Sequence, residues 1–207
     1  MPIKINVPFS QKDEAKKLGA IWVPDVKTWV IPDNIENINL FNTWLPNDGF
    51  IIKYPYLVAK DSRECWKCHK ETPLIALGAK TFFTTCFESK PNLKWQKIDY
   101  PAFFIGVRIM DNDLSKILKE QFPFYKEMPA KKTGRITWVN TCKHCQTIQG
   151  DDYNTDHPGA IFGGYLNEKK TLFRDKKMEQ IQLRFDYYID GVMYEGHYYW
   201  DGFSEAE

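Results

Sequence analysis

Two Cys-x-x-Cys pairs are the residues of this chain whose types and spacing could do chemistry. The first pair is Cys65 and Cys68 in ECWKCHKETP, and the second is Cys142 and Cys145 in NTCKHCQTIQGD. Two cysteines separated by two residues can turn both sulfurs toward one ion, and a second pair supplies the remaining corners of a tetrahedron. The sequence therefore predicts one structural Zn²⁺ held by four thiolates, in a closed site with no position for a substrate.

Other uses of these thiols stay open at this point. A single Cys-x-x-Cys pair is also typical of thioredoxin-like redox proteins, but that interpretation requires a strand before the pair and a helix after it, and neither segment shows this pattern. Four buried cysteines without a metal are another alternative. His69 and His144 stand beside the pairs and could replace one cysteine as a ligand. Glycine often follows the second cysteine of such a turn, whereas His69 and Gln146 do so here.

A long segment separates the two pairs, because 73 residues lie between Cys68 and Cys142. A compact zinc finger separates its ligand pairs by only about 12 to 20 residues. Tertiary folding must therefore close a shared site, and we expect the metal to act as a clamp between distant strands. The fifth cysteine, Cys86, has alternating apolar neighbours and is expected to be a small buried hydrophobic residue.

The elements that must position these cysteines indicate an α+β fold. Residues 1–46 are predicted to form a small module of a strand, a helix that Ser10 caps and Gly19 ends, and a hairpin. A second helix is predicted over residues 35–45. Residues 47–207 are predicted to form a β-rich, zinc-ribbon-like domain with an antiparallel sheet. Its expected elements are strands over residues 50–59, 80–87, 102–107 and 135–139 and a helix behind an aspartate cap in DNDLSKILKEQF.

The C-terminal segment carries the strongest hairpin signal. Apolar residues alternate from Leu183 to Ile189, and Asp190-Gly191 is a common two-residue turn. Residues 192–200 are therefore predicted to return as the second strand. Aromatic side chains crowd this hairpin among carboxylates, and the candidates for contact with a partner protein are Tyr188, Tyr194, Tyr198, Tyr199 and Trp200. Exposed Tyr and Trp are typical of protein interfaces, and packing against the core is the alternative.

Charge is distributed unevenly along the chain, although the formal net charge is only +1. Residues 61–150 carry 15 basic and 9 acidic groups, and residues 151–207 carry 6 and 12. The basic middle segment could contact nucleic acid close to Trp66 and Trp138, and the residues that would do so are Lys67, Lys70, Lys131, Lys132, Arg135 and Lys143. The alternative is two faces that neutralise one another in the fold.

Targeting and membrane signals were not found. The first residues, MPIKINVPFS, lack the apolar core of a secretory signal, and the longest apolar stretch, residues 102–107, is far too short to span a bilayer. We therefore expect a cytoplasmic protein, in a reducing compartment that keeps cysteines available to a metal.

The N-terminal segment VPFSQKDEAKKLGAIWVPDVKTWVIP resembles a small bacterial module known only as a domain of unknown function. The pattern is V-P-[FY], then K-[DE]-x-A-K-x-L-G-A-x-W, then W-x-x-P. It is matched by Val7, Pro8, Phe9, Lys12, Asp13, Ala15, Lys16, Leu18, Gly19, Ala20, Trp22, Trp29 and Pro32. Members often accompany DNA-processing proteins of plasmids and phages, so the resemblance implies a bacterial or mobile-element setting but no activity. The cysteine segments are similar to bacterial proteins that join this module to a zinc-ribbon-like region.

Enzyme signatures are mostly missing. The chain has no phosphate-binding loop, no H-E-x-x-H and no nucleophile elbow. One polar loop could bind a divalent ion or serve as acid and base, and its candidate residues are Asp151, Asp152, Asp156 and His157. A solvated turn beside Pro158 is the alternative interpretation of this loop.

Three hypotheses about function follow. The first is a non-enzymatic zinc-binding protein that binds a partner protein, with an accessory, immunity or inhibitor role in bacterial or phage systems. The second is a nucleic-acid-binding zinc-ribbon protein that uses the basic middle segment. The third is an enzyme that uses the loop from Asp151 to His157.

Overall fold

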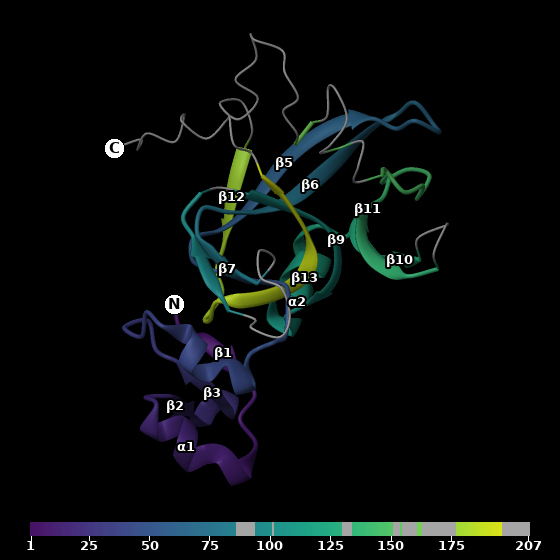
Figure 1. The fold of residues 1–207 in the computed structure, drawn as a ribbon. Coiled ribbons are helices and arrows are strands. Elements are labelled where there is room, and N and C mark those ends of the chain that lie inside the picture. The colour runs from purple at the N-terminus through teal and green to yellow at the C-terminus, as the bar shows by residue number, and fades with distance from the viewer. Residues whose placement is uncertain are drawn as a thin grey trace.

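The protein is described by a computed structural model covering residues 1–85, 94–100, 102–129, 134–150, 154, 161–162 and 177–195. For residues 177 and 192–195 only the backbone is described. The fold is α+β with antiparallel sheets, as predicted, and strands dominate it (Figure 1). In this part of the chain no helix is long and apolar enough to cross a membrane.

The N-terminal module contains one small antiparallel sheet in the order β1-β3-β2, with helical turns packed on it. Its elements are β1 (Ile3–Ile5), η1 (Phe9–Gln11), α1 (Lys12–Lys17), β2 (Ile21–Val23), η2 (Pro24–Val26), β3 (Thr28–Ile31) and η3 (Ile38–Trp44). The strand, helix and hairpin that the sequence predicts are therefore present. The core of the module also includes residues from the larger, eight-stranded sheet described below, among them Ile51 and Phe83.

The ends of helix α1 confirm one sequence prediction and correct another. Gly19 has φ +97°, and the N–H groups of Gly19 and Ala20 donate to the carbonyls of Lys16 and Ala15, both at 2.9 Å. This is the hydrogen-bond pattern of a glycine-terminated helix. Ser10 is not the N-cap as predicted, because a 3₁₀ turn precedes α1 and places Gln11 at that position without a side-chain hydrogen bond.

The predicted helix over residues 35–45 is a 3₁₀ helix, η3. Its buried side chains are Ile38, Phe41 and Trp44, which recur at every third residue. A spacing of three matches the period of a 3₁₀ helix, in which residues i and i+3 lie on one line. The helix predicted behind an aspartate is α2 (Asn112–Gln121), and the Asp111 side chain accepts a hydrogen bond from the N–H of Asp113 at 3.1 Å.

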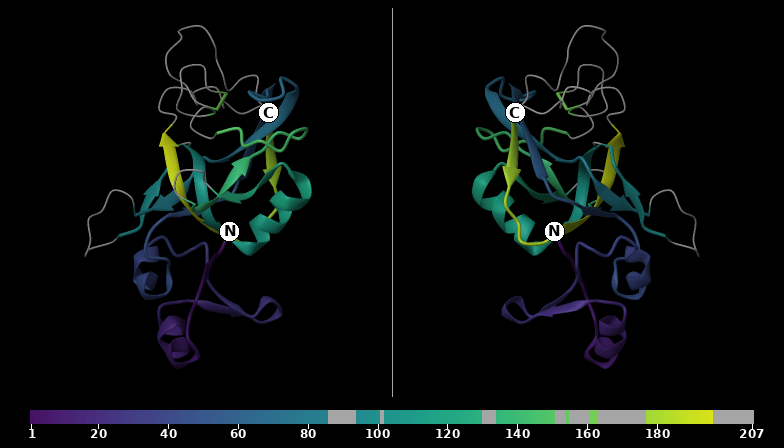
Figure 2. Two further views of the ribbon diagram at one scale, coloured as in Figure 1. Left: turned by 90° about the vertical axis from the view of Figure 1, so that its right-hand side faces the viewer. Right: turned by 90° about the vertical axis from the view of Figure 1, so that its left-hand side faces the viewer.

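The second sheet has eight antiparallel strands in the order β12-β5-β6-β9-β13-β4-β7-β8. They are β4 (Phe50–Ile52), β5 (Tyr56–Glu64), β6 (Glu71–Ala79), β7 (Phe82–Thr84), β8 (Gln96–Ile98), β9 (Ala102–Met110), β12 (Lys177–Ile181) and β13 (Tyr187–Glu195). The sheet curves strongly around its own core, and α2 packs against this core (Figure 2). The single strand predicted over residues 50–59 is in fact β4 and β5, which a bend at the cis Tyr54-Pro55 bond separates.

Alternation along the strands explains how both faces of this sheet are covered. In β5, Tyr56 and Val58 point into the core that the curved sheet encloses, whereas Leu57 and Ala59 join a smaller cluster on the other face. Side chains of neighbouring strand residues point to opposite faces, so a strand that is buried on both sides reads as a continuous apolar run.

The C-terminal hairpin prediction is wrong. Asp190 and Gly191 do not form a turn but lie inside the continuous strand β13, which pairs with β4 and with β9. The pairing with β9 shifts register between Asp190 and Val192, which is a bulge. A Cβ atom at Gly191 would lie 3.0 Å from the carbonyl oxygen of Ile105. The glycine is therefore needed because two strands approach closely at this point. An Asp-Gly pair in the sequence is equally compatible with this role and with a turn.

A third sheet of two strands, β10 (Tyr125–Pro129) and β11 (Ile136–Asn140), lies beside β9. Asn140 at the end of β11 is buried, and its side chain exchanges two hydrogen bonds of 2.9 Å with the backbone of Ile75 in β6. This contact fixes the end of β11 against the large sheet. The second cysteine pair follows directly.

Candidate metal centre

The four cysteines of the two pairs meet at one end of the molecule. Cys65 and Cys68 lie in the turn that joins β5 to β6, and Cys142 and Cys145 lie in the turn that follows β11. A strand leads into each pair, but the first pair is followed by strand β6 and no helix follows the second within residues 146–150. The strand-to-helix setting of a thioredoxin-like pair is therefore not found here.

The two turns repeat one hydrogen-bond pattern, and we call each of them a knuckle. In the first, the N–H of Cys65 donates to the carbonyl of Lys70 and the N–H of His69 donates to the carbonyl of Cys65, both at 2.9 Å. In the second, Cys142 and Gln146 make the same two bonds, at 2.8 and 2.9 Å. In both knuckles the N–H two residues after the first cysteine points at its Sγ atom at 3.4 Å. Backbone N–H groups directed at sulfur stabilise thiolates.

The residue after each pair adopts the conformation that glycine usually supplies. His69 has φ +58° and Gln146 has φ +59°. Left-handed backbone is unfavourable for residues with a side chain, so the surrounding turn imposes it. The absence of glycine from the sequence therefore does not prevent the knuckle geometry.

The sulfur atoms have the spacing of a tetrahedral metal site. All four Sγ atoms lie within 4.8 Å of one another. The separation is 3.7 Å between Cys65 and Cys145, and 3.6 Å between Cys68 and Cys142. A Zn–S bond of about 2.3 Å in a tetrahedron places sulfurs about 3.8 Å apart, whereas a disulfide places them about 2 Å apart. These residues could hold one metal ion with sulfur ligands.

Burial makes this cluster more than a set of neighbouring thiols. Cys65 and Cys142 are completely buried, and Cys68 and Cys145 are half-buried. The buried amide of Gln149 donates to Cys65 Sγ at 3.4 Å, and the hydroxyl of Thr147 lies 3.4 Å from Cys145 Sγ. Polar groups around the sulfurs are typical of the outer shell of metal centres, where they orient ligands.

The protonation of the cluster also favours a cation. Burial alone raises the pKa of the Cys65 thiol, but the N–H groups of Cys68 and Lys67 outweigh it and lower the pKa to about 6. The N–H of Lys70 lowers the pKa of Cys68, but burial and the neighbouring thiols outweigh it and raise the pKa to about 11. Like charges this close suppress one another, so four thiolates can coexist at neutral pH only beside a positive ion.

Neither histidine belongs to the cluster. The Nδ1 atom of His69 lies 2.8 Å from a carboxylate oxygen of Glu64, and the Nε2 atom of His144 lies 3.1 Å from the carbonyl oxygen of Glu71. Both rings are thus engaged away from the sulfurs, and among the described residues the group that could hold a metal consists of the four cysteines.

The basic residues of the middle segment are only partly brought together. Lys67, Lys70 and Lys143 are exposed on the knuckles, and Trp66 beside them keeps 58% of its surface exposed. Trp138 is only 2% exposed, because it packs against Tyr125 in the core, so it offers no surface for a ligand. Arg135 is exposed just before β11. Lys131 and Lys132 fall outside the described residues.

Most of the other candidate residues also fall outside the described part. Tyr188 is half-buried and packs against the core of the N-terminal module, and only the backbone of Tyr194 is described. The residues of which nothing is described are Cys86, Asp151, Asp152, Asp156, His157, Tyr198, Tyr199 and Trp200. The proposed interface and catalytic loop therefore stay predictions from the sequence.

Sequence reasoning missed the polar side chains that hold the knuckles in place. They are Thr72, whose hydroxyl accepts from the N–H of Lys143 at 3.0 Å, together with Asn140, Gln149 and Asn154. All four are buried. Three of them lie within a dozen residues of the second pair, but a single sequence does not distinguish a buried amide from an exposed one.

Comparison with known proteins identifies only the N-terminal part. Residues 3–46 match the family model described as "Domain of unknown function (DUF5710)". The segment that carries the cysteines is not covered by that match. No curated protein and no solved structure matches the chain.

Proposed function

We propose that the chain is a non-enzymatic zinc-binding protein that acts by binding another macromolecule, with the metal as a structural clamp. The observation that carries this proposal is the closed set of four sulfurs from two knuckles of identical hydrogen-bond pattern. Zn²⁺ favours four sulfur ligands in tetrahedral geometry, and such sites leave no position for a substrate.

The place of the site in the fold supports a clamp. The first knuckle closes the long β5–β6 hairpin, whereas the second ends β11 of the separate two-stranded sheet. Besides Asn140, the contacts that join these two regions are hydrogen bonds such as Trp66 Nε1 to the carbonyl of Ile148, at 2.9 Å. Without the metal, the thiols of Cys65 and Cys142 would be buried beside other thiols with no cation to balance them. Binding of a structural Zn²⁺ therefore adds directly to the stability of this end of the protein.

The arrangement of the sulfur atoms sets this proposal apart from the redox alternative. Sulfur contacts of 3.7 and 3.6 Å join different knuckles, Cys65 to Cys145 and Cys68 to Cys142. A dithiol enzyme instead needs the two cysteines of one motif to react with each other, with one of them accessible.

A partner protein that contacts the C-terminal tyrosines remains part of the proposal, as does an accessory, immunity or inhibitor role in a bacterial or phage system. The first rests on the aromatic and acidic sequence of that segment, and the second on the resemblance of the N-terminal module. Neither assigns a reaction to the chain.

The proposal is tested by substituting ligands and measuring metal and fold together. Cys65→Ser and Cys142→Ser are expected to lower the zinc content and to leave the protein insoluble or easily unfolded, because a lost ligand opens the site. Cys86→Ser is the matched control, and this variant is expected to keep its zinc content and its stability. A double variant, Cys65→Ser with Cys142→Ser, that is metal-free yet as stable as the parent protein would contradict the proposal.

The enzyme alternative has its own test. If the loop were catalytic, the variant with Asp151→Asn, Asp152→Asn and His157→Gln would lose the cellular function of the protein while keeping its zinc. We expect that function to be unchanged.

A further inference from the structure

We infer that the two knuckles form a binding surface for single-stranded nucleic acid, with Trp66 as a platform on which an unpaired base stacks. The knuckle surface consists of Trp66, Lys67 and Lys70 from the first knuckle and Lys143 from the second. The inference rests on the proposed function, because the metal holds the two knuckles together, and it names the class of macromolecule that is bound.

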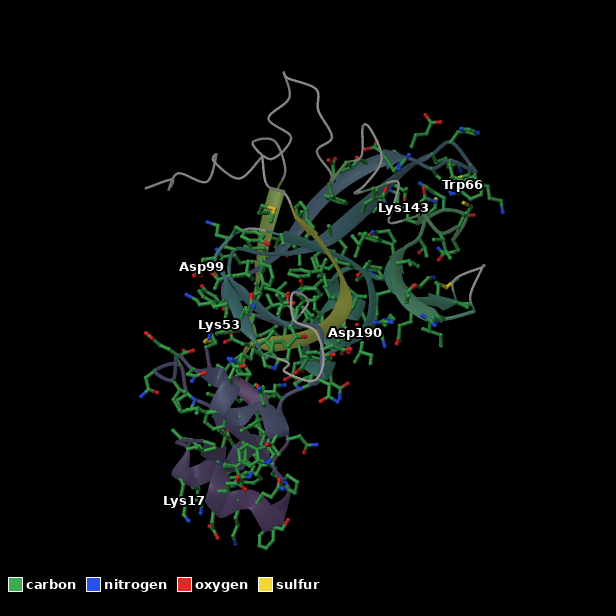
Figure 3. The ribbon with its side chains drawn as sticks, in the orientation of Figure 1. Lys17, Lys53, Trp66, Asp99, Lys143 and Asp190 are labelled. Atoms are coloured by element: carbon green, nitrogen blue, oxygen red, sulfur yellow. The ribbon has the colours of Figure 1, made fainter. Side chains whose placement is uncertain are left out.

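The first observation is the state of Trp66. Its side chain is 58% exposed, yet its indole N–H donates to the carbonyl of Ile148 at 2.9 Å. The acceptor lies just beyond the second knuckle, so the hydrogen bond that holds the ring spans both knuckles. Tryptophan anchored at its polar edge keeps its aromatic face in solvent with little freedom left to lose on binding. Figure 3 shows Trp66 at the same end of the molecule as Lys143.

The second observation is the charge around this ring. Lys67, Lys70 and Lys143 are exposed, and no described carboxylate lies within ion-pair distance of their ammonium groups. The carboxylates next to the knuckles have other partners: Glu64 contacts His69 Nδ1 and Glu71 accepts from the hydroxyl of Ser62. Three solvated ammonium groups beside an exposed aromatic face are complementary to a chain of phosphates that carries flat bases.

The backbone explains why these side chains stay together. Lys143 N–H is held by Thr72 Oγ1 at 3.0 Å, and Thr72 lies two residues beyond Lys70 at the end of the first knuckle. Lys67 N–H points at Cys65 Sγ at 3.4 Å. The main chain of Lys143 is thus tied to β6 directly after the first knuckle, and that of Lys67 to a sulfur ligand. A polyanion therefore meets a surface whose geometry the metal centre sets.

The exposed ring selects unpaired bases over a duplex. In a double helix the bases are stacked on each other and their faces are not accessible, whereas a single strand presents a face to any aromatic platform. Lysines alone would bind both forms through their phosphates. Preference for single strands is therefore the property that Trp66 adds.

The charge of the metal centre gives the three lysines an alternative, purely structural role. Four thiolates and one Zn²⁺ carry a formal charge of −2, and a purely structural role would use the three lysines to balance it. The structural role makes a distinct prediction. Neutral residues at the three lysine positions would then weaken metal binding and would have no effect on nucleic-acid binding.

The experiment uses the zinc-loaded full chain and measures fluorescence anisotropy of labelled single-stranded DNA, single-stranded RNA and duplex DNA of equal length. We expect both single strands to bind more tightly than the duplex. Trp66→Ala is expected to weaken single-strand binding about 5- to 100-fold, the range for loss of one stacked base. Trp66→Phe is expected to restore most of it. Trp22→Ala, at an exposed tryptophan of the N-terminal module, is the matched control and should change nothing.

The lysines are tested by salt dependence. The variant Lys67→Gln with Lys70→Gln and Lys143→Gln is expected to reduce the slope of log affinity against log salt by about 2, since each phosphate contact to a single strand contributes about 0.7. The control removes three other exposed lysines, Lys17, Lys27 and Lys116, and should keep the slope.

The outcomes separate this inference from the proposed function. Absence of oligonucleotide binding at low salt, in a zinc-loaded and stably folded protein, overturns the inference and leaves the clamp intact. Equal binding of duplex and single strand that does not depend on Trp66 also overturns it. Zinc loss in the triple lysine variant, without any effect on nucleic acid, assigns the lysines to the metal centre. A protein that never binds zinc overturns the proposed function itself.

Discussion

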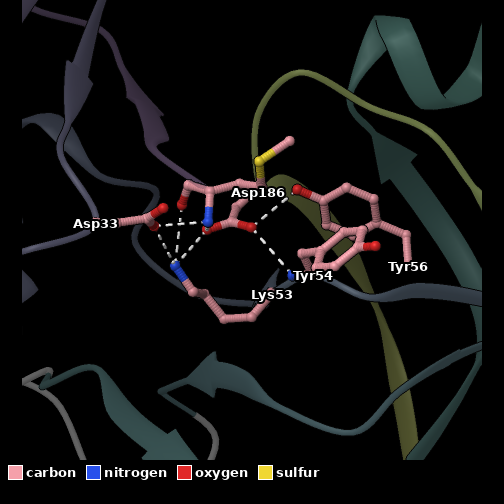
Figure 4. A network of polar contacts seen from close by, with 6 residues as sticks. Asp33, Lys53, Tyr54, Tyr56 and Asp186 are labelled. Atoms are coloured by element: carbon pink, nitrogen blue, oxygen red, sulfur yellow. Dashed lines mark hydrogen bonds and ion pairs between the residues drawn. The ribbon is translucent and has the colours of Figure 1, made fainter.

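The ammonium of Lys53 lies 2.5 Å from the carboxylate of Asp186, a side chain that is completely buried between the two parts of the fold. Asp186 also accepts from the hydroxyl of Tyr56 at 2.9 Å and from the N–H of Tyr54 at 3.2 Å (Figure 4). Asp33 of the N-terminal module lies 3.1 Å from the same ammonium. Burial raises the pKa of Asp186 more than Lys53 lowers it. This cluster holds the module against the large sheet.

Asp186→Ala should destabilise the protein by roughly 3 kcal/mol, because it leaves the Lys53 charge and the Tyr56 hydroxyl without their buried partner. Denaturant unfolding at neutral pH measures this change. Asp25→Ala is the control, since Asp25 and Arg184 also join the module to the rest of the fold, at 2.5 Å, but both are exposed. Exposed pairs contribute little, and we expect no measurable change. Equal effects of the two substitutions would contradict the importance given to burial.

Gly49→Ala should lower the free energy of unfolding by at least about 2 kcal/mol more than Gly134→Ala does. Both substitutions strain the backbone, but only the one at Gly49 adds steric overlap. Both glycines have positive φ, +98° and +66°. A Cβ atom at Gly49 would lie 2.6 Å from the carbonyl oxygen of Ile189, whereas no described atom lies within 4 Å of one at Gly134. Thermal unfolding of the two variants separates backbone strain from overlap. Similar melting temperatures would show that β13 can move away from Gly49.

His69→Gly should leave the zinc-loaded protein as stable or up to about 1 kcal/mol more stable, because glycine adopts φ +58° without the penalty of a side chain. His69→Val should destabilise it, since a β-branched residue is the least compatible with that backbone. Urea unfolding in the presence of zinc gives both values. His144→Gly, in the second knuckle but not at its left-handed position, should bring no gain. Stabilisation by both glycines would mean that the left-handed turn is not the cause.

Stability should fall as the pH rises above about 10, the pKa of tyrosine in an unfolded chain. Burial and the charge of Asp186 raise the pKa of Tyr56 and of Tyr187 well above that value. Burial raises the pKa of Tyr188 as well, to about 12. The folded state therefore keeps three tyrosine protons that the unfolded state loses, and each costs about 1.4 kcal/mol of stability per pH unit. Unfolding measured between about pH 9 and about pH 11 tests this slope.

Tyr187→Phe provides the matched variant. The Tyr187 hydroxyl is buried and has no hydrogen-bond partner among the described residues. Its removal should be neutral or stabilising at neutral pH, because a buried unpaired hydroxyl is unfavourable, and should reduce the alkaline slope by one proton. An unchanged slope would indicate that Tyr187 ionises without unfolding.

Local patterns predicted much of this fold. The module strands, the end of α1 at Gly19 and the Asp111 cap of α2 all follow from interactions between near neighbours, which a single sequence contains. Asp190-Gly191 shows the limit of such reasoning. Its glycine is required by a strand that lies 86 residues earlier in the chain, at Ile105, and the local sequence cannot separate this cause from a turn.

The metal centre was likewise predictable only in part. Repetition of the Cys-x-x-Cys spacing identified all four cysteines, because the spacing is itself the geometric requirement. The groups that orient the knuckles, Thr72, Asn140 and Gln149, were not identified, since their roles depend on contacts across 65 residues or more of sequence. The left-handed turns at His69 and Gln146 could not be predicted for a local reason, because the sequence lacks the glycine that usually marks such turns.

The metal content of the purified chain, combined with X-ray absorption at the zinc edge, tests the central claim most directly. The account predicts one zinc per chain, surrounded by four sulfur atoms at about 2.3 Å and no nitrogen or oxygen ligand. A folded chain without stoichiometric zinc, or a zinc whose shell includes His69 or His144 nitrogen in place of sulfur, would contradict it.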